Sequence, residues 1–556
     1  MKIKSLLLIF CLISSLFNSV EGKNNKKEKL VKITYEQYNR GNLIPDKEIV
    51  LTCANGFVKL SNPSKIESFF IDYNSKAVVK VLNIDSIQYK QRNPFSELAE
   101  AKETDEKQNI LGYECKKASF LIFSNRINVW YTTETKFKAS PSLSAIIENG
   151  LILKYEANGN YTIQAKSIDL EKATMQYPQE NLPEINQAEY RELIIKSRYT
   201  TIPVFDKEQI NFQGGIENPT EEICNHTYRF SKGTVIMKKI KMPKMSPGGN
   251  VFAKLTNWSN GDAYDRTGCV FTLADDNKKS ILTALKNGLD QLPVYLDKRG
   301  NEYQGVISTE NYTVPTELMR FFTSFGVGYF NNKRPINSYN WQDSVVYKQD
   351  ITELIPDNKN EIWIGVFIGN YDKGGHKVSL ELDYYPPFEN SSVKEKFIKP
   401  LFYTLNIMEA QGQNYGRMFK NDTLTMTFDI TDDIKNPQLL FTSTGHGGWG
   451  NGDEFVPKLN QVFIDDELIF KHIPWRCDCG TYRMSNPASG NFGNGLSSSD
   501  LSRSNWCPAT LTQPFYIPLA NLKKGKHIIK VAIDQGDDEG SSFNHWSVSG
   551  ILVGNK

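Results

Sequence analysis

The chain has 556 residues and a mass of 63.3 kDa, too large for one hydrophobic core, so we expect roughly three domains. Its 65 Lys and Arg balance 63 Asp and Glu, which argues against a protein that binds nucleic acid by neutralising phosphates. Hydrophobic residues at 39% exclude a disordered chain, and aromatic residues at 12% favour β structure and carbohydrate-facing surfaces.

The first 22 residues are predicted to be a secretory signal peptide. Lys2 and Lys4 precede the apolar run Leu6–Phe10, and small or polar residues lead to a cleavage site near Gly22. An uncleaved membrane anchor would need ~20 apolar residues, and this run is shorter. No later segment is apolar for long enough to span a bilayer. We therefore expect a secreted or periplasmic protein that is monomeric and does not bind a membrane.

The domains that we expect after the signal peptide are an N-terminal accessory domain with its linker at 23–200, a first β-sandwich at 201–388 and a second at 389–556. Residues 23–48 are charged and polar, which favours a loose lead-in. Residues 171–200 carry prolines and mixed charge, which favours a linker or a short helix. The Pro386-Pro387 pair is a natural break between the sandwiches.

Nearly all of the predicted secondary structure is β. Short apolar or alternating runs separated by Gly, Pro, Asn and Asp are typical of sandwiches and jelly rolls. The runs are Ile127–Tyr131, Leu151–Tyr155, Tyr161–Ala165, Thr234–Lys241, Val251–Leu255, Val270–Leu273, Trp363–Phe367, Lys377–Tyr384, Leu424–Ile430, Val462–Ile464 and His527–Ile533. Asn158-Gly159 tolerates positive φ and predicts a hairpin between the second and third runs. Only Lys278–Leu292 has helical spacing, and an irregular connection stays possible there.

Seven cysteines remain once Cys11 is removed with the signal peptide, so at most three disulfides form within one chain. Connectivity stays open, and the plausible pairs are Cys53–Cys115, Cys224–Cys269 and Cys479–Cys507. The last pair brackets a segment rich in Gly, Ser and Asn, and closing such a loop is worth roughly 3–4 kcal/mol. Zinc at Cys477-Asp478-Cys479 is disfavoured, because no second Cys or His pair lies at finger spacing.

Two short segments place charged groups where they could act on a ligand. In the first, Asp265 stands next to Arg266, whose positive charge would keep the carboxyl ionised. An Asp-capped turn with a surface ion pair explains that segment equally well. In the second, a disulfide through Cys507 would fix Arg503 and Trp506 at a defined place, or would only order a long loop.

The segment Thr444–Phe455 carries the most candidate chemistry. Five glycines within residues 445–452 permit positive φ and a close approach of the backbone to a ligand. The segment also brings an acid/base group, an aromatic face for a sugar and two carboxylates: His446, Trp449, Asp453 and Glu454. We favour a functional loop over a flexible connector. Serine-hydrolase, HExxH, Walker and dinucleotide-binding motifs are missing from the sequence, which leaves hydrolysis by carboxylates or glycan binding.

Three motifs resemble the peptide:N-glycosidase F family. Asp262–Arg266 is similar to its D-E-W-D-R segment, Gly452–Phe455 to C-A-E-W, and Arg503–Pro508 to R-A-G-W-C-P. The resemblance implies a mainly β fold of two adjacent antiparallel jelly-roll sandwiches, here preceded by the separate, mostly β N-terminal domain. It also implies an active site at the interface of the jelly rolls, a Cys479–Cys507 disulfide, and no cofactor or metal.

The resemblance further implies hydrolysis of the glycosylasparagine amide of N-glycoproteins, which converts Asn to Asp and releases the whole glycan. The expected catalytic residues are Asp265, Glu454 and Arg503, and the expected substrate-binding residues are Arg266, His446, Trp449, Asp453 and Trp506. In this hypothesis the acids handle the water and the leaving amine, and the arginines stabilise the oxyanion. An endo-β-N-acetylglucosaminidase and a non-catalytic glycan-binding module are the alternatives.

Two features depart from the family pattern. The family's third acid should lie near Trp363–Tyr371, where no Glu occurs and Asp372 is the nearest acid, and the cysteines that flank the family's C-A-E-W-C are absent around Glu454. The extra N-terminal part suggests the longer, second type of the enzyme. It resembles the GLPGLI-type secreted bacterial domains, at Leu111–Ala118, Trp130–Thr132 and Gly150–Leu153.

Overall fold

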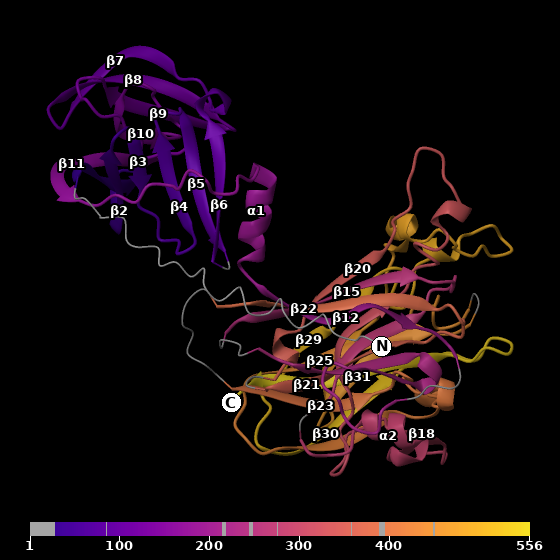
Figure 1. Cartoon of the computed structure of the whole chain (residues 1–556). Coiled ribbons are helices and arrows are strands. Elements are labelled where there is room, and N and C mark those ends of the chain that lie inside the picture. Colours follow the sequence, from indigo (N-terminus) through magenta and orange to yellow (C-terminus); the bar gives the residue numbers. More distant parts are fainter. Residues whose placement is uncertain are drawn as a thin grey trace, which may run out of the picture. The chain divides into compact units, whose positions relative to one another are not determined.

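The structure is a computed structural model that describes residues 28–84, 86–213, 218–243, 248–274, 276–356, 359–387, 395–448 and 451–556. The chain divides into two compact units, Met1–Ser197 and Arg198–Lys556 (Figure 1). The predicted signal peptide and the predicted boundary at residue 388 lie outside the described residues. Within the described ranges, none of the helices has both the length and the apolar character that a membrane crossing needs.

The first unit is built on one antiparallel sheet with the strand order β6-β5-β4-β3-β2-β1-β11-β10-β9-β8-β7. Its strands are β1 (Glu28–Asn39), β2 (Asn42–Ala54), β3 (Phe57–Leu60), β4 (Glu67–Asp72), β5 (Ala77–Ile84), β6 (Ile87–Pro94), β7 (Lys102–Ile110), β8 (Tyr113–Ile122), β9 (Asn125–Thr132), β10 (Leu151–Ala157) and β11 (Tyr161–Ala173). The sheet curls around its own apolar face (Figure 1). Helix α1 (Gln187–Lys196) is tied to β4, because the Tyr190 hydroxyl donates a hydrogen bond of 2.5 Å to Glu67.

The expected loose lead-in at 23–48 is wrong for its described part. β1 lies in the middle of the sheet and pairs with both β2 and β11. Leu30, Ile33 and Tyr35 are buried there, although polar residues such as Lys32 and Thr34 stand between them. The predicted hairpin is confirmed, since Asn158 and Gly159 have φ of 52° and 70° between β10 and β11.

The first jelly roll of the second unit packs two antiparallel sheets face to face, with the strand orders β12-β22-β15-β20 and β13-β14-β21-β16-β19-β28. The strands are β12 (Thr200–Ile210), β13 (Thr227–Phe230), β14 (Val235–Lys241), β15 (Asn250–Ser259), β16 (Thr267–Thr272), β19 (Thr316–Phe322), β20 (Val345–Asp350), β21 (Glu361–Ile368), β22 (His376–Tyr385) and β28 (Leu511–Thr512). A small hairpin, β17 (Val294–Leu296) and β18 (Glu302–Gln304), forms a separate two-stranded sheet. The predicted helical segment forms α2 (Ile281–Asn287) and a short 3-10 turn.

The second jelly roll packs the sheets β23-β31-β25-β29 and β24-β30-β26-β27. The strands are β23 (Lys396–Tyr403), β24 (Leu424–Ile430), β25 (Lys435–His446), β26 (Asn460–Ile464), β27 (Glu467–His472), β29 (Phe515–Pro518), β30 (Gly525–Ile533) and β31 (His545–Asn555), with the short helix α3 (Met418–Asn421) before β24. The predicted fold class is therefore confirmed.

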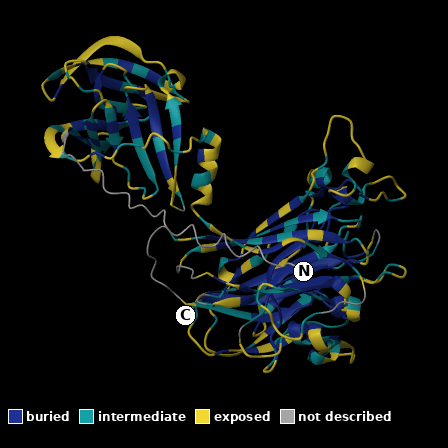
Figure 2. Ribbon diagram, in the orientation of Figure 1, coloured by how far each residue is buried: buried dark blue, intermediate teal, exposed yellow. Residues whose placement is uncertain are grey.

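One of the apolar clusters of the second unit extends from the first jelly roll into the second (Figure 2). Leu440, Ile551 and Val553 of the second jelly roll belong to the cluster that fills the first. Strand β28 also crosses over, because it follows residues of the second jelly roll in the chain yet pairs with β19 of the first.

Two of the plausible disulfides are wrong. Cys53, Cys115, Cys224 and Cys269 are all free thiols in the structure. Three of them are buried among apolar side chains, where a free thiol behaves as a small hydrophobic group.

A buried ion pair on β19 forms hydrogen bonds across the junction between the jelly rolls. Arg320 on β19 binds both carboxylate oxygens of Glu317 at 2.8 Å, and neither side chain is more than 4% exposed. The Arg320 guanidinium also donates to the carbonyl of Ser547 and to the hydroxyl of Thr444, both in the second jelly roll. Glu317 in turn accepts a hydrogen bond from Ser549. The pair is fully hydrogen-bonded, which is the condition under which buried charges are tolerated.

We expect Arg320→Met to destabilise the second unit by about 3–5 kcal/mol, because it leaves the Glu317 carboxylate buried without a partner. Urea unfolding followed by circular dichroism measures this. The control is Lys524→Met, which removes an exposed ion pair with Asp433 and should change stability by less than about 1 kcal/mol. Equal effects of the two substitutions would contradict the importance of the buried pair.

Candidate active site

Asp265 lies in the turn between β15 and β16, and hydrogen bonds to other residues fix that turn. Asp262 Oδ1 accepts the N–H of Tyr264 at 3.0 Å. The Thr323 hydroxyl accepts the N–H of Arg266 at 2.7 Å and donates to the carbonyl of Tyr264 at 3.1 Å. The Asp265 side chain takes no part in these bonds, so it is left to face the site.

Asp262 is an anchor for Arg266. Asp262 Oδ2 accepts a hydrogen bond of 2.8 Å from Arg266 Nε and lies 3.5 Å from His376 Nε2. Burial raises the pKa of Asp262, but the interactions with His376 and Arg266 outweigh burial and lower that pKa to about 2. Asp262 therefore stays ionised and holds Arg266 through Nε and Nη2. Arg266 Nη1 makes no hydrogen bond with any described residue.

The glycine-rich segment after β25 folds back on itself and presents Glu454. Gly447 and Gly448 have φ of 101° and 76°, and a Cβ at Gly452 would overlap the carbonyl oxygen of Gly447. The N–H of Glu454 donates to the Gly447 carbonyl at 3.4 Å, and the N–H of Ser504 donates to the Glu454 carbonyl at 3.0 Å. These glycines permit a contact of backbone with backbone, which sets the direction of Glu454.

Arg503 is held by backbone pairing and by a disulfide. The N–H and carbonyl of Arg503 exchange hydrogen bonds of 2.9 Å with those of Arg476. Cys479, three residues after Arg476, forms a disulfide with Cys507, with the two Cα atoms 5.1 Å apart. Arg503 Nη2 also donates to the Ser498 carbonyl at 2.6 Å. These contacts, all from the second jelly roll, fix the position of the Arg503 guanidinium.

Asp265, Glu454 and Arg503 meet at the junction of the jelly rolls, and we call these three residues the carboxylate–arginine site. Arg503 Nη1 lies 3.2 Å from Asp265 Oδ2 and forms an ion pair with Glu454 Oε1. Asp265 comes from the first jelly roll, whereas Glu454 and Arg503 come from the second. The Arg503 side chain is 1% exposed, and the two acids are 15% and 17% exposed. The carboxyls are thus the part of the site that solvent reaches.

Both carboxyls have a raised affinity for protons. Burial raises the pKa of Asp265 to about 6 and that of Glu454 to about 7, although the positive charge of Arg503 opposes both shifts. The charge of Asp265 further raises the pKa of Glu454. Asp265 Oδ2 receives no hydrogen bond from the residues that the structure describes. Two adjacent carboxyls that titrate near neutral pH can exchange protons with a substrate, as acid–base catalysis requires.

Aromatic rings pack behind Arg503. Its guanidinium carbon lies 4.3 Å from the ring centre of Trp506 and 5.0 Å from that of Phe455. Trp506 stacks on Phe322 at 4.3 Å and donates from Nε1 to the Gly445 carbonyl at 3.0 Å. Trp506 is buried. The structure therefore places Trp506 as a support for Arg503, away from the solvent-facing side of the site.

Two other residues that we expected to bind substrate do not join the carboxylate–arginine site. His446 is buried and stacks 4.9 Å from His545, and burial together with nearby positive charge lowers the pKa of His446, which stays neutral. Asp453 is fully buried and accepts hydrogen bonds from Trp546 Nε1 at 2.7 Å and from the Gly536 N–H. Trp449 lies outside the described residues.

A further acid, Glu409, was missed from the sequence. Glu409 follows β23 of the second jelly roll, and a Cβ placed on Gly369 would lie 3.5 Å from Glu409 Oε2. Burial raises the pKa of Glu409, and interactions with Tyr371 and Arg266 partly offset that shift. No acid occurs in the segment Trp363–Tyr371, where one was expected, and Glu409 brings a carboxyl next to Gly369 of that segment. Asp372, the nearest acid in sequence, accepts two backbone N–H groups in its own turn.

The carboxyls of this site are paired with arginines. Among the residues that the structure describes, no group of three His, Cys, Asp or Glu side chains is arranged to hold a metal ion. Asp265 and Glu454 share a guanidinium, and Asp262 binds a second one. Two fixed arginines therefore lie where the carboxyls converge.

Family descriptions match all three parts of the chain. "N-glycanase peptide, N-terminal domain" matches residues 25–192, "Peptide-N-glycosidase F, N terminal" matches 201–384, and "Peptide-N-glycosidase F, C terminal" matches 414–553. No curated protein matches the chain.

Solved structures are also similar. PNGF-II in the P21 space group is 43% identical, with a TM-score of 0.86 over 95% of this chain and 99% of that chain. PNGF-II in the C2 space group is 42% identical, with a TM-score of 0.82 over 95% and 98%. PNGase F, a glycosylasparaginase from Flavobacterium meningosepticum, is 14% identical over 64% and 96%, with a TM-score of 0.42. The three family matches and the 43% identity show that this chain belongs to the peptide-N-glycosidase F family.

Proposed function

We propose that this protein is a peptide-N4-(N-acetyl-β-glucosaminyl)asparagine amidase. It hydrolyses the glycosylasparagine amide of N-glycoproteins, converts Asn to Asp and releases the whole glycan. The observation that carries the proposal is the carboxylate–arginine site, in which two acids with raised pKa share one buried guanidinium. This site lies within the parts of the chain that match the peptide-N-glycosidase F descriptions.

The chemistry assigns one proton transfer to each acid. Asp265, as the carboxyl with the lower pKa, takes a proton from water while the water oxygen adds to the amide carbonyl carbon. Glu454, as the carboxyl with the higher pKa, gives a proton to the amide nitrogen as the carbon–nitrogen bond breaks. The products are Asp on the peptide and a glycosylamine, which then loses ammonia in water.

The arginines take different roles. Arg266 is held by Asp262 through Nε and Nη2, which leaves Nη1 to donate to the oxygen that becomes negative when water adds. Arg503 has Nη1 on both acids and Nη2 on Ser498, so it positions the carboxyls. Glu409 is the third acid of the site and faces Arg266.

The position of Arg503 favours the amidase over an endoglycosidase. A glycosidase places the sugar between its two carboxyls, so that one protonates the leaving oxygen while the other attacks or activates water. Here one nitrogen atom of Arg503 contacts both Asp265 and Glu454. The space between the acids is thus occupied by a protein cation, and both acids must act from the same side of the substrate.

The protein is further proposed to act outside the cytoplasm as a monomer, after removal of a signal peptide within residues 1–22. The apolar run behind two lysines supports this location. N-glycoproteins and glycopeptides are the substrates, and no cofactor takes part.

The test is mass spectrometry of an N-glycopeptide after treatment in 18O water. The amidase replaces the glycosylated Asn by Asp carrying one heavy oxygen. We expect Asp265→Asn to lower the rate by roughly 10²–10⁴-fold, because it removes the proton acceptor for water. Asp466→Asn, which changes an exposed acid on the second jelly roll, is the matched control and should keep the wild-type rate.

Other products would identify the alternatives. A peptide that keeps one GlcNAc would indicate an endo-β-N-acetylglucosaminidase. An unchanged glycopeptide that is retained by the protein would indicate a glycan-binding module. Full activity of Asp265→Asn would remove that residue from the mechanism.

The pH dependence tests the assignment of the two acids. Activity requires ionised Asp265 and protonated Glu454, so kcat/KM should rise with pH through about 6 and fall above about 7. The residual activity of Glu454→Gln should lack the falling limb, because glutamine does not lose a proton. Steady-state rates from pH 4 to 9 measure both limbs, and a falling limb that persists in Glu454→Gln would show that another group donates the proton.

A further inference from the structure

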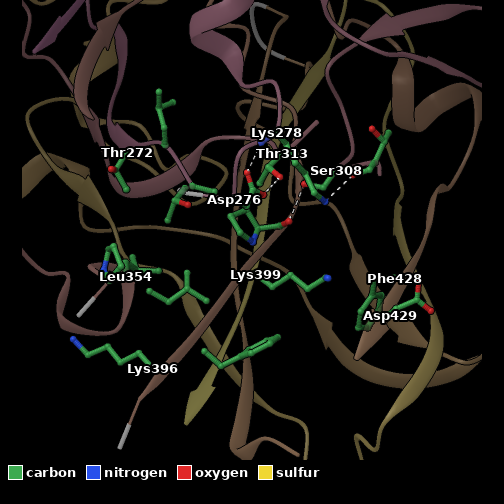
Figure 3. A pocket seen from close by; sticks show the side chains of 18 of the residues that line it. Thr272, Asp276, Lys278, Ser308, Thr313, Leu354, Lys396, Lys399, Phe428 and Asp429 are labelled. Atoms are coloured by element: carbon green, nitrogen blue, oxygen red, sulfur yellow. Dashed lines mark hydrogen bonds between the residues drawn. The ribbon is translucent and has the colours of Figure 1, made fainter. Parts of the chain in front are cut away.

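A cavity of about 760 Å³ lies between the two jelly rolls, away from the carboxylate–arginine site. β16 begins next to Arg266 and ends at Thr272, which lines the cavity, so about one strand length of roughly 20 Å separates the two places. β23 and β24 of the second jelly roll form one wall. The loops at 273–278 and 308–313 of the first jelly roll contribute described residues to the other (Figure 3). The volume is within the range of small-ligand sites.

Lys399, on β23, is a positively charged residue of the cavity lining. Its side chain is partly buried and extends across the cavity (Figure 3). The ammonium makes no hydrogen bond or ion pair with any residue that the structure describes. Solvent reaches Lys399 Nζ, so this ammonium is available to donate to a ligand that enters the cavity.

Two carboxylates, Asp276 and Asp429, lie near Lys399 and favour its charged form, but neither forms an ion pair with it. Asp276 is already bonded to the Thr313 hydroxyl and to the N–H of Lys278. Lys278 donates from Nζ to the Thr309 carbonyl at 3.2 Å. Burial and the positive charge of Lys278 lower the pKa of Lys399, while Asp429 and Asp276 act in the opposite direction. A bound anion would relieve the repulsion between the two lysines.

The remaining lining is a mixture of hydroxyl and apolar groups. The hydroxyls of Thr309 and Thr427 have no hydrogen-bond partner among the described residues. Phe397, Ile398 and Phe428 contribute apolar surface. A sugar ring presents both hydroxyl groups and apolar C–H faces, so this lining suits a sugar better than it suits a bare inorganic ion.

We propose that this cavity is a second ligand site, which binds an acidic sugar through the Lys399 ammonium and through hydroxyl groups such as that of Thr427. The acidic group is a carboxylate or a sulfate ester, and both are acceptors for an ammonium. The site does not depend on the proposed amidase activity, because the residues that form it are separate from the carboxylate–arginine site.

The experiment is isothermal titration calorimetry of the full chain with 3′-sialyllactose, with lactose 3′-sulfate and with lactose. We expect at least one acidic sugar to bind at least tenfold more tightly than lactose, and the comparison of the two identifies the acidic group. Lys399→Gln should lower that affinity at least tenfold, because it removes the charge while keeping most of the side-chain volume. Thr427→Val, on strand β24 of the same wall, should lower the affinity for the acidic sugar severalfold.

Lys524→Gln is the control, since it removes an exposed lysine outside the cavity and should bind like the wild type. Hydrolysis of a neutral glycopeptide by Lys399→Gln should match the wild type, which separates this proposal from the amidase. Equal binding of lactose and both acidic sugars would overturn the proposal. So would wild-type binding by Lys399→Gln, or inorganic phosphate that binds as tightly as the acidic sugars.

Discussion

The contact on which the site depends is the sharing of the Arg503 guanidinium by two carboxyls from different jelly rolls. Because Arg503 is 1% exposed, it could not be buried at this place without acids beside it. Asp265 and Glu454 supply the acids, and one guanidinium cannot neutralise both. Burial of this acid pair raises the pKa of both carboxyls, and the charge of Arg503 only partly offsets that shift.

Hydrogen bonds, a glycine contact and a disulfide set the direction of these three side chains. Asp262 and Thr323 fix the turn that carries Asp265. The contact of Gly452 with Gly447 folds the loop that carries Glu454. The disulfide and the pairing with Arg476 fix the segment of Arg503. The glycine loop is local in sequence, whereas Thr323 lies 57 residues from Arg266 and the disulfide spans 28 residues. Together these contacts bring three distant segments within hydrogen-bond reach, as a preorganised site requires.

Sequence reasoning succeeded where local pattern decides the structure. Alternating residues mark Leu424–Ile430, and the same bounds define β24. It failed at β1, whose charged residues concealed a central strand with buried apolar residues. It expected both Asp453 and Glu454 in the site, whereas the folded glycine loop buries Asp453 and turns only Glu454 toward Arg503. No local signal marks Glu409, because its interactions with Tyr371 and Arg266 bring together segments that are distant in the chain.

A series of buried contacts connects the junction of the jelly rolls with the carboxylate–arginine site. Arg320, which joins the jelly rolls, donates to the Thr444 hydroxyl, and that hydroxyl lies 2.9 Å from His446 Nε2. His446 packs 5.4 Å from Trp506, whose ring lies behind Arg503. Every member of this series is buried, and buried side chains in a closely packed interior have little room to move independently. A shift of one jelly roll against the other would therefore reach the guanidinium and change the separation of the two acids, so the rigidity of the junction is itself a requirement of the chemistry.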